Sequence, residues 1–94
     1  MKSLGDLNKS CLVTNKKGVH ARAAAQIVST SSKFESQITV THQSKSADSL
    51  SLIKLLTLDA PQGSTLEISA TGSDAALAIK ALTELIESGF GELD

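Results

Sequence analysis

The chain has 94 residues and a mass of 9.8 kDa, which predicts a single small domain. Nine Lys and Arg residues stand against ten Asp and Glu residues, and this net charge of −1 argues against a general affinity for nucleic acid, which requires a clustered basic surface. The chain has two Phe, no Trp and no Tyr, so it lacks the aromatic rings that stack on single-stranded bases or enclose quaternary amines.

From the N-terminal part of the chain we expect neither export nor membrane insertion. Residues 1–9 contain no long apolar run, and no stretch approaches the ~20 apolar residues of a membrane span. Cys11 is alone, which excludes an internal disulfide and an all-cysteine metal site. We expect a cytoplasmic protein with no membrane partner and no metal, in which residues 1–9 form a flexible extension of a single domain spanning 1–94.

Hydrophobic periodicity predicts four strands and three helices. In chain order they are a strand at 10–14, a helix at 21–32, a strand at 37–41, a short edge strand beside the polar turn at 42–46, a helix over the apolar run 52–58, a strand at 64–70 and a helix from 75 to about 88. The order βαββαβα predicts an α+β open-faced sandwich, with a mainly antiparallel four-stranded sheet covered on one face by three helices.

Residues 18–22 lie where a strand, a glycine turn and a helix start meet. His20 is predicted at the N-cap, followed by the unpaired backbone N–H groups of Ala21, Arg22 and Ala23. Such a terminus attracts anions, and the planar guanidinium of Arg22 suits phosphate. The residues alone indicate a candidate phosphate or carboxylate site, although a histidine here can also be an ordinary capping or exposed residue.

The apolar run at 52–58 covers more of its helix than a core contact needs. Leu55 and Leu58 are predicted to face the core, while Leu52, Ile53 and Leu56 cover the other edge. Two interpretations stay open: the short helix is simply well buried, or these three side chains form an exposed docking patch.

Residues 18–25, Gly-Val-His-Ala-Arg-Ala-Ala-Ala, resemble the active-site stretch of HPr, the histidine-containing phosphocarrier of the bacterial phosphotransferase system. Residues 45–58 resemble the regulatory serine of that family and the helix that follows it. The resemblance extends over residues 10–93, and it departs from the family pattern at Ala23, where proline is usual. Alanine constrains the first helical turn less than proline does.

The resemblance implies that His20 accepts a phosphoryl group from Enzyme I and passes it to an Enzyme IIA domain. The amides of Ala21 and Arg22 would hold the phosphate, and the Arg22 side chain would neutralise charge during transfer. The chain would then be a carrier without turnover of its own and without a cofactor, and we expect it to be a monomer. The resemblance also implies that partners bind on Leu52, Ile53, Leu56 and Ala25.

Ser51 is predicted to cap the helix that begins after it. The resemblance adds that this serine is the one phosphorylated by HPr kinase/phosphorylase. Phosphate there would complement the helix dipole but place negative charge beside the apolar patch. Ser46 and Ser49 are nearby alternatives.

The remaining polar residues receive ordinary structural interpretations. His42 is predicted to be exposed near a turn, and Cys11 to be a small inward-facing hydrophobe. The C-terminal acids, including Glu92, are predicted to be solvated, although the ending Ser88–Glu92 resembles phosphocarriers of the nitrogen-related branch. Two alternatives to the carrier remain: a regulatory module in which Ser51 phosphorylation selects partners while His20 is idle, and a small-anion-binding domain.

Overall fold

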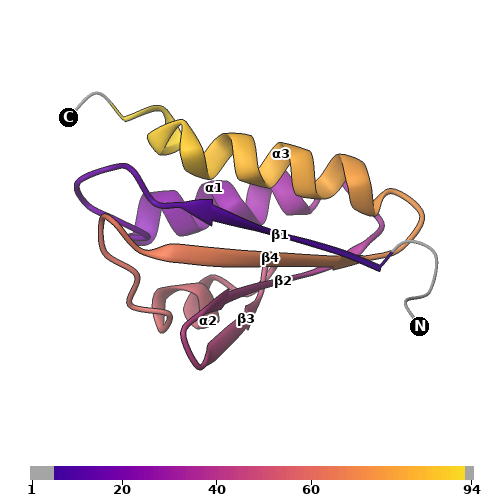
Figure 1. Cartoon of the computed structure of the whole chain (residues 1–94), viewed down its shortest axis with the longest axis horizontal. Helices are drawn as coiled ribbons and strands as arrows, with labels where there is room; N and C mark the ends of the chain where they lie inside the picture. The colour runs from indigo at the N-terminus through magenta and orange to yellow at the C-terminus, as the bar shows by residue number, and fades with distance from the viewer. Residues whose placement is uncertain (1–5, 93–94) are drawn as a thin grey trace.

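A computed structural model describes residues 6–92, which form one sheet and three α-helices (Figure 1). The elements are β1 (Asp6–Leu12), α1 (Ala21–Ser31), β2 (Gln37–His42), β3 (Lys45–Asp48), α2 (Leu52–Leu56), β4 (Thr65–Thr71), α3 (Ala75–Glu87) and the short 3-10 helix η1 (Gly89–Gly91). This order confirms the predicted open-faced sandwich. Within residues 6–92, no helix has the length and apolar character needed to cross a bilayer.

The strands lie in the order β1-β4-β2-β3, and every neighbouring pair is antiparallel. α1 and α3 run side by side over one face of the sheet, and α2 lies against α1 and β3 (Figure 1). The opposite face carries polar side chains, such as Thr41 and Ser46, whose hydroxyl oxygens are 2.9 Å apart. We therefore look for the functional site on the helix-covered side of the sheet and at the ends of its strands.

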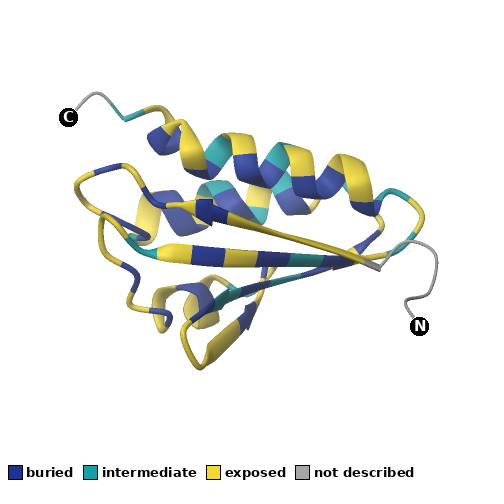
Figure 2. Cartoon of the chain, in the orientation of Figure 1, coloured by how far each residue is buried: buried dark blue, intermediate teal, exposed yellow. Residues whose placement is uncertain are grey.

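The core lies between the sheet and the helices, and burial alternates along β2 and β4, as Figure 2 shows for β4. Its fully buried large side chains include Ile27, Ile38, Val40, Leu66, Ile68, Leu82 and Ile86. Cys11 is 3% exposed, as predicted for a small inward-facing hydrophobe. Burial and then the nearby Glu87 carboxylate raise the pKa of the Cys11 thiol to about 11, so the thiol is not the reactive thiolate at neutral pH.

Two predicted boundaries are wrong. β1 begins at Asp6, where it pairs with Thr71 of β4, so residues 6–9 belong to the sheet and not to a flexible extension. The polar, exposed residues at the start of this edge strand hide its pairing, which β4 supplies from far along the chain. Residues 1–5, the rest of the predicted extension, lie outside the described residues. α2 ends at Leu56, two residues before the apolar run does.

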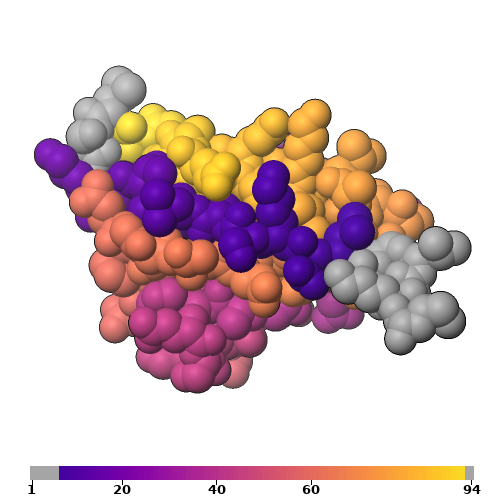
Figure 3. Space-filling view, viewed as in Figure 1, coloured from indigo at the N-terminus to yellow at the C-terminus, as the bar shows by residue number. Residues whose placement is uncertain are grey.

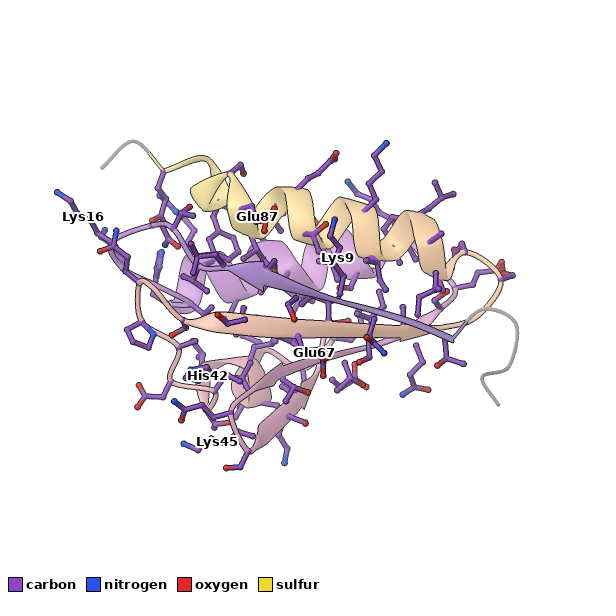
Figure 4. All side chains as sticks on the ribbon, in the orientation of Figure 1. Lys9, Lys16, His42, Lys45, Glu67 and Glu87 are labelled. Atoms are coloured by element: carbon purple, nitrogen blue, oxygen red, sulfur yellow. The ribbon has the colours of Figure 1, made fainter. Side chains whose placement is uncertain are left out.

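The exposure predicted for His42 is also wrong. His42 is only 9% exposed and its Nδ1 lies 2.8 Å from the carbonyl oxygen of Leu58, so the ring is a satisfied part of the core edge (labelled in Figure 4). It continues the inward alternation of Ile38 and Val40 along β2. The polar residues that follow His42 masked this periodicity.

The turn between β1 and α1 is held against the segment that leads from α2 to β4. Val19 N–H donates to the carbonyl of Ala60 at 2.9 Å, and Gly63 N–H donates to that of Val13 at 2.8 Å. Gly18 has a φ of +66°, and a Cβ atom there would lie 2.3 Å from the oxygen of Ala60. Only glycine fits both this backbone conformation and this close approach.

We expect Gly18→Ala to destabilise the fold more than Gly63→Ala does. Gly63 also has a positive φ, +90°, but a Cβ there would meet nothing within 4 Å. Gly63→Ala should therefore cost about 1–2 kcal/mol for the left-handed backbone alone. Gly18→Ala should cost roughly 1–3 kcal/mol more because the added methyl overlaps the Ala60 peptide. Urea denaturation measures both losses, and equal losses would contradict a rigid contact at Gly18.

Candidate functional site

His20 stands at the start of α1, at the N-cap position predicted for it. Its backbone is extended, with φ −90° and ψ −175°, and its carbonyl accepts from the N–H of Ala24 at 2.8 Å. The preceding turn is fixed by the side chain of Asn15, whose Nδ2 donates to the carbonyl of Gly18 at 2.9 Å. The His20 side chain is 26% exposed, so the ring is held at one edge and accessible at another.

The N-terminus of α1 offers open hydrogen-bond donors. No backbone carbonyl among residues 6–92 accepts from the amides of Ala21, Arg22 or Ala23, and the first turn contains no acidic residue. These amides carry the positive end of the helix dipole. The Arg22 side chain is 67% exposed. The structure thus brings together His20, Arg22 and the predicted backbone donors, an arrangement suited to an anion.

Glu92 completes this cluster, and the prediction that it is solvated is wrong. Its side chain is only 4% exposed, and its Oε2 is paired with Nε2 of His20 and lies 3.6 Å from Nη2 of Arg22. Its Oε1 accepts from Nδ2 of Asn15 at 2.9 Å. Figure 3 shows the C-terminal segment, in yellow, lying against the indigo segment that follows β1.

The C-terminal segment reaches the site because the chain reverses direction after α3. Gly89, Phe90 and Gly91 have φ values of +74°, +58° and +73°, and the Phe90 side chain is 3% exposed in the core. The Gly-Phe-Gly sequence is a signal for this turn, because two glycines tolerate the left-handed backbone and the aromatic ring anchors it.

The surroundings of Glu92 favour its charged form. The hydrogen bond from Asn15, the contact with His20 and then the charge of Arg22 hold the pKa of this carboxyl below its ordinary range. The site therefore holds an ionised carboxylate next to the imidazole ring. Lys16, which lies in the same turn, projects away from the molecule and is not part of the cluster (Figure 4).

The second candidate region is α2, where the predicted division of the apolar side chains is confirmed. Leu55 and Leu58 are buried at 0% and 1% exposure, whereas Leu52, Ile53 and Leu56 are 41%, 74% and 40% exposed. We call these last three residues the α2 patch. Leu50, which lies outside the apolar run 52–58, is also exposed on the approach to α2, and Ala25 is exposed on α1.

Ser51 occupies the N-cap of α2, and its Oγ accepts from the N–H of Lys54 at 3.3 Å. Its residue is partly exposed. The two alternatives to Ser51 lie elsewhere: Ser49 is buried at 1% exposure, and Ser46 pairs with Thr41 on the open face of the sheet. Ser51 is thus the serine among the three that adjoins the α2 patch.

Comparison with known proteins places this geometry in a family. The family model for the HPr component phosphorylation site of the phosphotransferase system matches residues 7–88. The phosphocarrier protein HPr of Xylella fastidiosa is 38% identical over 86 residues, covering 92% of this chain and 97% of that protein. The phosphocarrier protein NPr of Shewanella violacea is 34% identical over 86 residues, covering 92% of this chain and 94% of that protein.

A solved structure agrees with these sequence relationships. The crystal structure of HPr-C-His from Thermoanaerobacter tengcongensis matches with a TM-score of 0.88 and 43% identity, covering 94% of this chain and 99% of that one. The chain therefore belongs to the HPr family of phosphocarrier proteins of the phosphotransferase system.

Proposed function

We propose that the chain takes a phosphoryl group on His20 from Enzyme I and passes it to an Enzyme IIA domain. The observation that carries this proposal is the partly exposed His20 ring at the start of α1, beside the open amides of Ala21 and Arg22 and the Arg22 guanidinium. In this role the chain is a stoichiometric carrier with no catalytic turnover and no cofactor. It works in the cytoplasm as a monomer, with no membrane or nucleic-acid partner.

The transfer step needs little from the carrier besides position and charge. A lone pair on a ring nitrogen of His20 forms the N–P bond while the bond between phosphorus and the donor breaks, and that electron pair leaves with the donor. The loose transition state spreads negative charge over the three equatorial oxygens. The amides of Ala21 and Arg22 and the guanidinium of Arg22 are the groups available to stabilise that charge.

We expect His20→Ala to accept no phosphoryl group when incubated with phosphoenolpyruvate and Enzyme I. The matched control is His42→Gln, which removes the chain's other imidazole at a position outside the site and should be labelled like the unmodified protein. Acid-labile phosphate is quantified by mass spectrometry. Labelling of His20→Ala would contradict the proposal, and reversible phosphate binding without covalent labelling would favour the small-anion-binding alternative.

The α2 patch is positioned to contact the partner that faces His20. Leu56 is four residues from Ala60, a separation of at most about 14 Å, and the carbonyl of Ala60 accepts from the N–H of Val19, next to His20. A typical interface buries about 800 Å² per partner, a region roughly 30 Å across. One partner can therefore cover the patch and His20 together, and we propose that the exposed Ala25 of α1 takes part in the same contact.

We expect Ile53→Glu to slow transfer from Enzyme I about tenfold, which corresponds to ~1.4 kcal/mol of binding free energy. Ile53 is the most exposed member of the patch, so the substitution should not unfold the domain. The control is Leu77→Glu, which places the same charge on a 64% exposed leucine of α3. Both are measured as kcat/KM of Enzyme I with the chain as substrate. Equal rates for the two variants would show that partners do not use the patch.

Ser51 phosphorylation is proposed as the regulatory modification, with HPr kinase/phosphorylase as the enzyme. A phosphate at this N-cap would accept from the same backbone amide that Ser51 Oγ now engages, and α2 should persist. The phosphate would also bring nearly two negative charges next to Leu52 and Ile53. An apolar partner surface would then have to desolvate those charges, which weakens docking.

We expect Ser51→Asp to slow phosphoryl transfer from Enzyme I about tenfold while leaving the unfolding midpoint almost unchanged, because aspartate also caps helices well. Ser46→Asp is the control, since Ser46 lies on the open sheet face away from α2. Stopped-flow transfer kinetics and thermal denaturation give the two readouts. Transfer by Ser51→Asp at the rate of Ser46→Asp would contradict regulation through this surface.

An alternative is a role in the nitrogen-related branch, or as a purely regulatory protein whose phosphorylation state selects its partners. The likeness to the NPr of Shewanella violacea favours this alternative, as does the Ser88–Glu92 ending. Parallel labelling with the sugar-branch and the nitrogen-branch Enzyme I of one bacterium separates the branches by their rates.

A further inference from the structure

The carboxylate of Glu92 is built into the site by three side chains and by its own backbone. Asn15 donates to Oε1 at 2.9 Å, His20 Nε2 pairs with Oε2, and Nη2 of Arg22 lies 3.6 Å from Oε2. Glu92 N–H donates to the carbonyl of Gly89 at 3.0 Å, and the buried Phe90 ring anchors the turn in between. With a side chain only 4% exposed, Glu92 is a fixed part of the site.

The contact with Glu92 determines which nitrogen of His20 is free. An ionised carboxylate can only accept hydrogen bonds, so Nε2 must carry the hydrogen that it shares with Oε2. A neutral imidazole with hydrogen on Nε2 has its lone pair on Nδ1. Among residues 6–92, no hydrogen-bond partner occupies Nδ1 of His20. The nitrogen that can attack phosphorus is therefore the one that faces away from Glu92.

We propose, resting on the proposed transfer function, that Glu92 is a positioning residue that holds hydrogen on Nε2 of His20 and so presents Nδ1 to the phosphoryl donor. No proton has to move during the step. The Nδ1 lone pair forms the N–P bond, the ring becomes an imidazolium that keeps its Nε2 hydrogen, and the Glu92 carboxylate balances that positive charge. On transfer to the acceptor, the N–P electron pair returns to Nδ1.

The contacts of Glu92 indicate more than a structural role in holding the C-terminal segment in place. Asn15 bonds Oε1 and Phe90 anchors the segment, whereas Oε2 is directed at the ring and the guanidinium. A carboxylate next to a phosphoryl-accepting ring also repels the incoming phosphate. The arrangement is favourable only if the phosphate bonds to the ring nitrogen that faces away from Glu92.

The test compares Glu92→Gln with Glu84→Gln, which removes the same charge from an exposed position on α3. Nitrogen-15 NMR of unphosphorylated protein reports which ring nitrogen of His20 carries hydrogen and whether that hydrogen is protected from solvent exchange. We expect a protected Nε2 hydrogen in the unmodified protein and in Glu84→Gln, and loss of its protection in Glu92→Gln. We expect Glu92→Gln to accept the phosphoryl group about tenfold more slowly, as for loss of a hydrogen bond to a charged group.

Several results would overturn the proposal. They are hydrogen on Nδ1 in place of Nε2, phosphate attached to Nε2 in the labelled protein, or acceptance by Glu92→Gln at the rate of Glu84→Gln. The last of these overturns the role of Glu92 but leaves His20 as the carrier. A protected Nε2 hydrogen in a protein that takes no phosphoryl group from Enzyme I overturns the transfer function itself, and with it the use proposed for Glu92. Because the NMR measurement uses the unmodified protein, it remains decisive even if Glu92→Gln folds poorly.

Discussion

The position of His20 depends on the close approach of the Gly18 backbone to the Ala60–Pro61 peptide. This contact joins the turn after β1 to the segment after α2, two parts of the chain about 40 residues apart. It sets the direction in which α1 leaves the turn, and the helix direction determines where the open amides point. It also brings α2 and its patch to the same end of the molecule. A side chain at Gly18 would push the turn away from the Ala60–Pro61 peptide, and would so move His20 and the α1 amides away from the α2 patch. The glycine is therefore needed to keep the phosphoryl-accepting site next to the docking surface.

The site is notable for containing an anion of its own. A helix N-terminus and an arginine would by themselves favour any phosphate or carboxylate. Glu92 engages the ring and lies 3.6 Å from one nitrogen of the Arg22 guanidinium, which leaves the amides of Ala21 and Arg22 and the rest of the guanidinium as donors. An internal carboxylate of this kind weakens binding of free phosphate by repulsion. It penalises a covalently delivered phosphoryl group less, because the donor protein supplies the binding energy.

The features of the fold that depend only on residues close together in the sequence could be predicted from it. The helical period over residues 52–58 correctly predicted that Leu55 and Leu58 are buried and that Ile53 is exposed, because this period alone decides which side chains share a face. Contacts between distant segments were not predictable in this way. Asp74 is the N-cap residue of α3, yet its carboxylate accepts from the amides of Glu35 and Ser36 and not from its own helix. In the sequence, Glu92 looks like an ordinary surface acid. Its contact with His20, 72 positions away, depends on the turn of left-handed residues before it.

The near absence of aromatic residues agrees with the demands of a relay. The proposed carrier must bind Enzyme I, release it, and present the same surface to an Enzyme IIA domain. Binding hot spots rich in Trp and Tyr would slow each release, since most differences in affinity lie in dissociation rates. The α2 patch is small and aliphatic, and the chain's net charge of −1 adds little long-range attraction. A surface of this kind gives contacts strong enough to orient the His20 ring and weak enough to be exchanged between partners.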